Sequence, residues 1–246
     1  MSARAALVTG AAGGIGRAIT ERLVTDGWDV LAVDLAPASD GRGEQFAADL
    51  ATREGNEAAV AAALERFGRL DAVVPNAGFQ HVARIEEFPD EQWDRLLAVL
   101  LTSPFLLAKN AWRALRASGD GRIVVVASVH GLVASPYKAG YVAAKHGVLG
   151  LVKTLALEGA EDGIGVAAVC PGYVRTGLVE SQVAAQAAVH DIPEERVVED
   201  VLLAPQAVKQ LQEPEDVAEA VAFLLGPTGR FATGSPLVLD GGWTAR

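Results

Sequence analysis

A tyrosine and a lysine four residues apart, Tyr141 and Lys145, are the side chains whose types and spacing point most directly to proton transfer. The apolar pattern that runs through them predicts a helix, and side chains at i and i+4 share one helix face. A positive charge about 6 Å from a phenol favours the phenolate by roughly 2–3 kcal/mol at an effective dielectric constant of about 20. We therefore expect the pKa of Tyr141 to lie about two units below its ordinary value, which suits a general acid or base.

Ser128 stands thirteen positions before Tyr141 and directly follows a short β-branched run, Ile123 to Ala127. Such a run predicts a buried strand, and a side chain at the point where a strand leaves the sheet can reach a ligand. A Tyr-x-x-x-Lys pair alone is common on solvated helix faces. Its combination with Ser128 and with a glycine-rich turn near the N-terminus is what indicates a catalytic site.

The glycine-rich turn has the strand, turn and helix context of a dinucleotide-binding site. A first strand is predicted at Ala5 to Thr9 and a helix from about Ile15 to Thr25. Between them, Gly10, Gly14 and Gly16 let the backbone approach a pyrophosphate, whose charge a helix N-terminus stabilises.

The second predicted strand, Asp29 to Val33, is followed by Asp34. A carboxylate at the end of this strand can accept hydrogen bonds from the adenosine ribose hydroxyls, and it repels a 2′-phosphate. We therefore expect NAD as the cofactor and not NADP.

These residues, with the glycine turn in the form Thr-Gly-x-x-x-Gly-x-Gly, resemble the short-chain dehydrogenase/reductase family over essentially the whole chain. The resemblance implies that Ser128, Tyr141 and Lys145 are the catalytic residues, with Tyr141 as general acid/base. It also implies a set of cofactor contacts spread over the chain: Gly10, Gly14, Ile15 and Gly16 in the turn, Asp34, the pair Asp49 and Leu50, the turn Asn76, Ala77 and Gly78, the catalytic Tyr141 and Lys145, and Pro171, Gly172, Val174 and Thr176 after the sixth strand.

Two positions depart from the family pattern. Pro75 replaces the first Asn of the family's Asn-Asn-Ala-Gly turn, which puts the hydrogen bonding of that turn in doubt. Leu100 replaces an Asn that in the family helps to hold a water for proton release. Ser103, one helical turn on, is the nearby side chain that we expect to hold such a water instead, unless a backbone carbonyl does so.

Four polar side chains near the predicted catalytic residues could hold a small carboxylate: Gln80, His130, Lys138 and Gln182. Each also has an ordinary explanation as a solvated surface or loop residue. A hydrogen bond to a charged group contributes roughly 1.5–3 kcal/mol, so that their convergence would bind a carboxylate specifically.

With their neighbours these residues resemble the D-3-hydroxybutyrate dehydrogenases of bacteria, in which the matching side chains bind the carboxylate of 3-hydroxybutyrate or acetoacetate. Tyr173 is expected to line the same substrate site and stands where those enzymes have a Trp. The expected reaction is reversible oxidation of D-3-hydroxybutyrate to acetoacetate. Two alternatives stay open: a dehydrogenase for another small hydroxy acid or alcohol, or a nucleotide-binding sensor with impaired catalysis. A thioester substrate fits less well, because it has no carboxylate at that position.

Predicted strands and helices alternate throughout the 246 residues. We expect an α/β fold with one Rossmann-type doubly wound parallel sheet of about seven strands and helices on both faces. Residues 1–246 are predicted to form a single NAD-binding domain. A long helix is expected from Gln92 to Arg116. Residues 177–213 exceed a simple connection and are predicted to form a two-helix substrate lid.

The composition narrows the possible partners. A net charge of −10 argues against nucleic acid and against an anionic membrane surface. Cys170 is the single cysteine and ends an apolar run, so a buried structural thiol and a cytoplasmic location are expected. No ligand spacing of a metal site is present. The family resemblance suggests a homotetramer packed through its long helices.

Overall fold

The computed structural model describes residues 3–245. Its centre is a seven-stranded sheet with the order β3-β2-β1-β4-β5-β6-β7, in which all neighbouring strands are parallel. The strands are β1 (Ala5–Thr9), β2 (Asp29–Asp34), β3 (Glu44–Ala47), β4 (Ala72–Val74), β5 (Arg122–Val126), β6 (Gly165–Pro171) and β7 (Pro236–Leu239). The predicted doubly wound parallel sheet is therefore confirmed. The chain turns in opposite directions from β1 and β4, and in such sheets the crevice at the carboxyl ends of these strands binds ligands.

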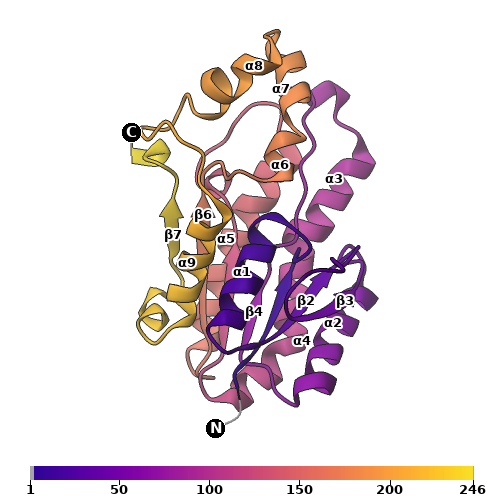
Figure 1. Cartoon of the computed structure of the whole chain (residues 1–246), viewed down its shortest axis with the longest axis vertical. Helices are drawn as coiled ribbons and strands as arrows, with labels where there is room; N and C mark the ends of the chain where they lie inside the picture. Colours follow the sequence, from indigo (N-terminus) through magenta and orange to yellow (C-terminus); the bar gives the residue numbers. More distant parts are fainter. Residues whose placement is uncertain (1–2, 246) are drawn as a thin grey trace.

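Helices cover both faces of the sheet (Figure 1). One face packs against α2 (Arg53–Phe67), α4 (Ser103–Ser118) and α5 (Ala139–Gly159), and the other against α1 (Gly14–Thr25) and α9 (Pro214–Leu225). The central strands are almost wholly buried, which explains their continuous apolar sequences.

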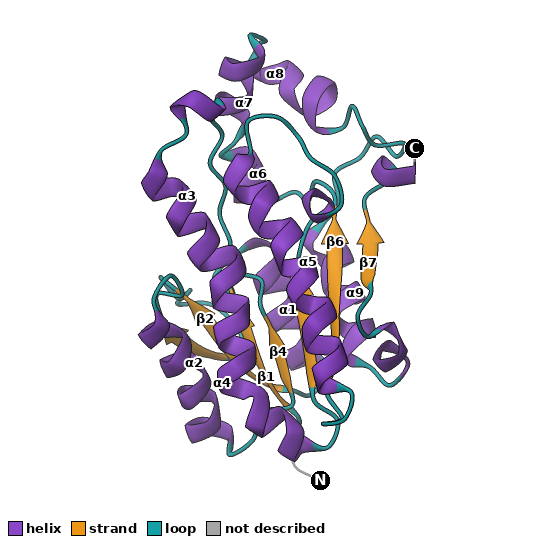
Figure 2. Cartoon of the chain, turned by 180° about the vertical axis from the view of Figure 1, so that it is seen from behind, coloured by secondary structure: helices purple, strands orange, loops and turns teal. Residues whose placement is uncertain are grey.

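The helix predicted from Gln92 to Arg116 differs in detail from the structure. It consists of α3 (Asp90–Leu97), a π turn (Ala98–Thr102) and then α4, which together form one rod beside α5 (Figure 2). A π turn inserts one extra residue and often marks a functional site. Leu100 lies within it.

The predicted lid also differs from the structure. Residues 177–213 contain three short helices and a second π turn instead of two helices: α6 (Gly177–Glu180), α7 (Val183–His190), α8 (Glu194–Val197) and the π turn Val198–Leu202. Pro193, and Asp191 with its left-handed backbone, separate α7 from α8. These helices lie beyond the carboxyl ends of the strands (Figure 1). Short 3₁₀ turns complete the fold at Ile85–Glu87, Val129–Gly131, Thr228–Ala232 and Trp243–Ala245.

Candidate active site

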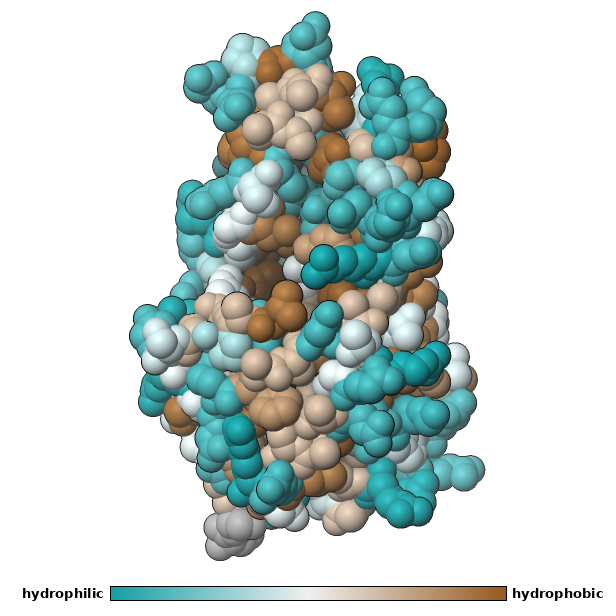
Figure 3. Space-filling model, turned by 90° about the vertical axis from the view of Figure 1, so that its right-hand side faces the viewer, coloured by the Kyte–Doolittle hydropathy of each residue, from teal (hydrophilic) through white to brown (hydrophobic). Residues whose placement is uncertain are grey.

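A cavity of about 370 Å³ lies at the carboxyl ends of the strands, beneath the lid. Figure 3 shows a hollow with an apolar floor about halfway along the molecule. Most of the side chains predicted from the sequence line this cavity: Gly10, Gly14, Ile15, Asp34, Asn76, Gly78, Gln80, Ser128, His130, Lys138, Tyr141, Lys145, Pro171, Gly172, Tyr173, Val174, Thr176 and Gln182.

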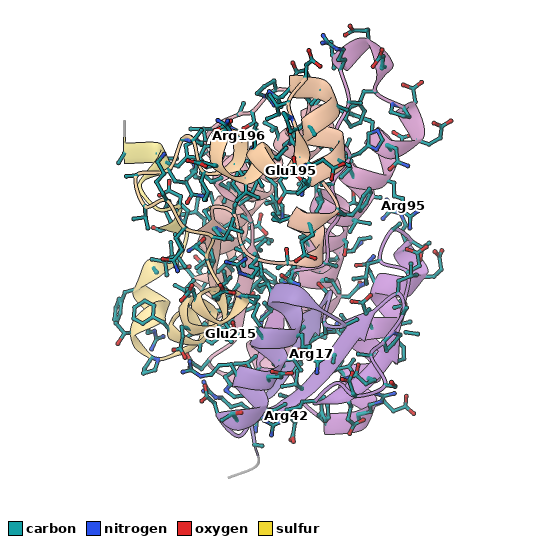
Figure 4. The ribbon with its side chains drawn as sticks, turned by 45° about the horizontal axis from the view of Figure 1, so that its top comes forward. Arg17, Arg42, Arg95, Glu195, Arg196 and Glu215 are labelled. Atoms are coloured by element: carbon teal, nitrogen blue, oxygen red, sulfur yellow. The ribbon has the colours of Figure 1, made fainter. Side chains whose placement is uncertain are left out.

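A second cavity, of about 410 Å³, adjoins the first through Gly10, Asp34 and Gly78, which line both. Three further predicted cofactor-binding residues line it: Asp49, Leu50 and Ala77. It is also lined by residues that sequence reasoning missed, Phe79, Gln92 and Arg95. Arg95 projects from α3 (Figure 4), and its guanidinium lies 5.6 Å from the centre of the Phe79 ring. These residues come together only where α3 packs against the turn after β4, and no local sequence pattern predicts that contact.

The glycine turn fits a dinucleotide pyrophosphate. Gly10 and Gly14 have φ values of 66° and 52°, which side-chain-bearing residues rarely adopt. Gly16 lines neither cavity, but a Cβ at this position would overlap the carbonyl group of Gly10. The predicted glycines therefore allow the turn to pack closely at the start of α1, where backbone N–H groups attract phosphate.

Asn76 ties this turn to β4, despite the proline before it. Its backbone N–H and that of Ala77 donate to Oγ1 of Thr9, at 2.9 and 3.0 Å. Its side-chain amide donates to the carbonyl of Thr9 at 2.9 Å. Pro75 accepts a bond from the backbone N–H of Val126 at 2.9 Å. The turn from Pro75 to Gly78 is therefore well hydrogen-bonded, although Pro75 replaces the first Asn of the family pattern.

Asp34 stands at the end of β2, as predicted. Its Oδ2 accepts a hydrogen bond from the backbone N–H of Ala12 at 3.0 Å, and its Oδ1 accepts one from that of Leu35 at 2.7 Å. These bonds fix the carboxylate at the border of the two cavities.

Ser128, Tyr141 and Lys145 meet on one side of the main cavity. Ser128 and Tyr141 share a side-chain hydrogen bond. The Lys145 ammonium lies 5.6 Å from the centre of the Tyr141 ring and donates to the carbonyl of Val126 at 2.8 Å. A strand end and the first turns of α5 thus bring together the three residues that the sequence singled out.

The expected lowering of the Tyr141 pKa is wrong for this arrangement. Burial raises the pKa of Tyr141 above its ordinary value, and the hydrogen bond with Ser128 opposes that rise. Burial also lowers the pKa of Lys145 to about 8. Both groups are desolvated in the fold, and this effect outweighs the charge of Lys145, on which the expected lowering rested.

Lys138 is buried in the wall of the cavity, with 2% of its surface exposed. Its ammonium donates to the Tyr173 hydroxyl at 2.8 Å, and burial lowers its pKa to about 8. Tyr173 stacks on Trp243 with ring centres 5.6 Å apart, and burial raises its pKa. No ion pair between Lys138 and an acidic side chain occurs within residues 3–245.

His130 is buried between two serines. Its Nδ1 lies 3.5 Å from Oγ of Ser128, and its Nε2 lies 2.9 Å from Oγ of Ser135. Burial, with the charge of Lys138 and then of His146, lowers the pKa of His130 to about 3, so that the imidazole is neutral. Sequence reasoning missed Ser135, which lies in the loop between Ser128 and Lys138 but carries no signal by itself.

The two predicted glutamines both line the cavity. Gln182 is buried, and its Nε2 donates to the carbonyl of Leu178 at 2.7 Å while its Oε1 has no hydrogen-bond partner. Oε1 of Gln80 accepts a bond from the backbone N–H of His81 at 3.0 Å. Both are placed to add polar contacts to a ligand beside Lys138.

Ser103 does not reach the cavity. Its hydroxyl donates to Oδ1 of Asn56 at 2.6 Å in the buried contact between α4 and α2. The expectation that Ser103 holds a water in place of the family Asn is therefore wrong, because the π turn directs this side chain to the other side of the rod. Leu100 lines the cavity and packs with Leu96 and Ala144.

Cys170 is buried at the end of β6, and burial raises the pKa of its thiol to about 11, as suits a structural cysteine.

Among the described residues, no group of His, Cys, Asp or Glu side chains could hold a metal ion. No helix in the same part of the chain is long and apolar enough to span a membrane.

A family model described as enoyl-(acyl carrier protein) reductase matches residues 10–244. A D-beta-hydroxybutyrate dehydrogenase of Rhizobium meliloti is 41% identical over 99% of both chains. One of Cupriavidus necator is 38% identical over the full length of both. The ligand-free structure of the aldohexose dehydrogenase of Thermoplasma acidophilum superposes with a TM-score of 0.91, at 30% identity, over all of this chain and 95% of the other.

Proposed function

Because this chain belongs to the short-chain dehydrogenase/reductase family, we propose that it oxidises D-3-hydroxybutyrate to acetoacetate reversibly, with NAD as the cofactor. The buried Lys138 ammonium carries this proposal. A buried cation normally has an anionic partner, and Lys138 has only the neutral phenol of Tyr173 as a side-chain hydrogen-bond partner among the described residues. A substrate carboxylate would supply the missing negative charge.

NAD would be held by the glycine turn, by Asp34 and by the residues that line the second cavity. When bound, NAD accepts a hydride. Ser128 would donate a hydrogen bond to the C3 oxygen of the substrate, and Tyr141 would take the hydroxyl proton. Lys145 would orient the cofactor ribose and stabilise the ionised phenol. Lys138, Gln182 and Gln80 would hold the carboxylate, which keeps C3 next to the hydride acceptor. His130, the fourth residue expected in this clamp, has a serine hydroxyl beside each ring nitrogen and is left out of the proposed clamp.

A rate assay that follows NADH formation tests the proposal. Wild-type protein should oxidise D-3-hydroxybutyrate with NAD and should prefer it over the L-enantiomer, since the carboxylate clamp and Tyr141 fix two of the substituents at C3. Protein that binds NAD but turns over no small hydroxy acid would instead favour the sensor alternative.

The Tyr141→Phe variant separates chemistry from cofactor affinity. It should lose at least about a hundredfold in kcat, because it lacks the group that takes the proton, while NAD binding measured by fluorescence titration should persist. A variant that retains a tenth of the wild-type rate would remove Tyr141 as the acid/base.

We also propose that residues 1–246 act as one NAD-binding domain, with residues 177–213 as a lid that closes over the substrate. The lid supplies Gln182 to the main cavity, and Val179 and Thr176 beside it line the same space.

A further inference from the structure

His130 lies in the wall between the main cavity and a third cavity. Ser128, on its Nδ1 side, lines the main cavity, and Ser135, on its Nε2 side, lines the third, which has a volume of about 310 Å³. Pro136 and Asp200, which also line the third cavity, are exposed, so this cavity reaches the protein surface. The imidazole therefore connects the catalytic serine with a space that solvent can enter.

On the opposite side of the site, neither Leu100 nor Ser103 offers a polar side chain to Lys145. The Lys145 ammonium is buried and bonded to the Val126 carbonyl. Leu100, 2% exposed, packs there with Leu96 and Ala144. Ser103, which could have offered a hydroxyl, is bonded to Asn56 on the far side of the rod.

We propose that the proton taken up by Tyr141 leaves through a hydrogen-bonded chain formed by Ser128, His130 and Ser135, and reaches solvent in the third cavity. This inference rests on the proposed function, because it concerns the proton that alcohol oxidation releases. It assigns Ser135 as a positioning and relay residue that does not itself line the main cavity.

Each group of the relay between Tyr141 and the third cavity gives up one proton for each proton that it receives. The Tyr141 hydroxyl gives its proton to Oγ of Ser128 as the serine proton passes to Nδ1 of His130. The proton on Nε2 then passes to Oγ of Ser135, and the proton of that serine passes to water in the third cavity. Tyr141 is left for the next turnover as a phenolate, which burial disfavours and which the adjacent Lys145 ammonium would stabilise. Rotation of the two hydroxyls restores their starting directions, and exchange with water, in which Nδ1 loses one proton and Nε2 gains one, restores the imidazole tautomer.

The surroundings of His130 suit such a transfer. A neutral imidazole donates at one nitrogen and accepts at the other, so one ring can serve both serines. Its backbone N–H donates to Oγ of Ser128 at 3.1 Å, which fixes the serine beside the ring. Tyr141, Tyr173 and Trp243 each meet the ring edge to face, with ring centres 5.3 to 6.3 Å apart, and hold its plane.

The Ser135→Ala variant tests the relay without removing a residue of the main cavity. We expect kcat for D-3-hydroxybutyrate oxidation to fall at least about tenfold, with KM little changed and a larger solvent isotope effect on kcat. The first-turnover burst of NADH should persist, because only the return of Tyr141 to phenolate is slowed. Ser135→Thr keeps a hydroxyl and should recover most of the rate. Ser118→Ala, which removes a hydroxyl bonded to the Leu115 carbonyl at the end of α4, is the matched control.

Unchanged kcat and an unchanged solvent isotope effect in Ser135→Ala would overturn the relay. An equal fall of kcat in Ser135→Ala and Ser135→Thr would also overturn the relay, because it would indicate that Ser135 serves packing. In His130→Ala the relay predicts a fall in kcat that added imidazole partly restores, whereas a carboxylate clamp alone predicts a rise in KM.

Nitrogen-15 NMR of His130 distinguishes failure of the relay from failure of the proposed function. A neutral ring hydrogen-bonded at both nitrogens is expected whether or not 3-hydroxybutyrate is the substrate. A charged ring, or one with a free nitrogen, would overturn the relay directly. If the ring is as expected and the wild-type protein does not oxidise 3-hydroxybutyrate, the substrate assignment fails, and the same variants are then compared on the alcohol that the enzyme does oxidise.

Discussion

Ionisable side chains at this site are buried together, and burial controls their charge more than their neighbours do. Burial lowers the pKa values of Lys138 and Lys145 to about 8 and that of His130 to about 3, and it raises that of Tyr141. Each group is thus shifted toward its neutral form. Charges brought by substrate and cofactor would therefore have a large effect on this site.

Lys138 should make carboxylate recognition depend on pH. Its lowered pKa means that the ammonium is charged below about pH 8 and is lost as the pH rises through that value. The ratio of kcat/KM for D-3-hydroxybutyrate to kcat/KM for butan-2-ol should therefore fall above about pH 8. Lys145 affects both substrates, so that the ratio isolates Lys138.

Lys138→Met should flatten this ratio and lower it about tenfold to a hundredfold, as expected for one charge-assisted hydrogen bond. A ratio that is independent of pH in the wild-type enzyme would contradict the carboxylate clamp.

Asp34 should decide between the two nicotinamide cofactors. Asp34→Ala removes both the acceptor for the ribose hydroxyls and the repulsion of a 2′-phosphate, so that the kcat/KM preference for NAD over NADP should narrow about tenfold or more. Steady-state rates with both cofactors give this preference. Asp40→Ala removes an exposed carboxylate that is paired with Arg17 and makes the same change of net charge. This control variant should leave the preference for NAD over NADP unaltered. Equal use of both cofactors by the wild type would refute the assignment.

At the scale of elements, the π turn between α3 and α4 determines which side chains face the site. It turns Leu100 toward the main cavity and leaves Ser103 against α2. The loop before α5 has a similar role, since Tyr137 adopts a φ of 68° directly before the buried Lys138. Such a backbone conformation is costly for a residue other than glycine, and surrounding contacts must maintain it.

Ser103→Ala should affect stability and not proton transfer. It leaves Oδ1 of the buried Asn56 without its 2.6 Å donor, which costs about 1–3 kcal/mol of unfolding free energy. Denaturant unfolding measures this loss, and Ser118→Ala, near the end of the same helix, is the comparison. A lower kcat in Ser103→Ala with unchanged stability would show that Ser103 serves the proton path after all.

At the scale of the whole molecule, two of the helices that cover the sheet also present apolar side chains outward. Phe105 on α4 is 42% exposed and Leu157 on α5 is 79% exposed. Exposed apolar groups on adjacent helices are typical of surfaces where copies of a chain meet.

We predict a homotetramer packed through these helices. Sedimentation equilibrium should give about four times the chain mass of 25.5 kDa. Leu157→Glu should shift the protein to smaller assemblies, because it places a charge in the contact, whereas Ile85→Glu, at the equally exposed turn before α3, should not. A monomer at all concentrations would contradict this prediction.

Several parts of the protein follow from local sequence. The strand Ala5–Thr9 has the predicted limits, because a buried strand needs continuous apolar residues. The glycine turn, Asp34 and the spacing of Tyr141 and Lys145 are equally local. They were sufficient to predict the fold class and the residues that gather at the site.

Other properties depend on contacts between segments far apart in the chain, and only the tertiary structure decided them. The rise in the Tyr141 pKa comes from burial by several elements, and the direction of Ser103 comes from its packing against Asn56. The neutral His130 between Ser128 and Ser135, and the pairing of Lys138 with Tyr173, likewise require the folded loop and lid. Desolvation and side-chain direction are set by three-dimensional surroundings, and no local spacing encodes them.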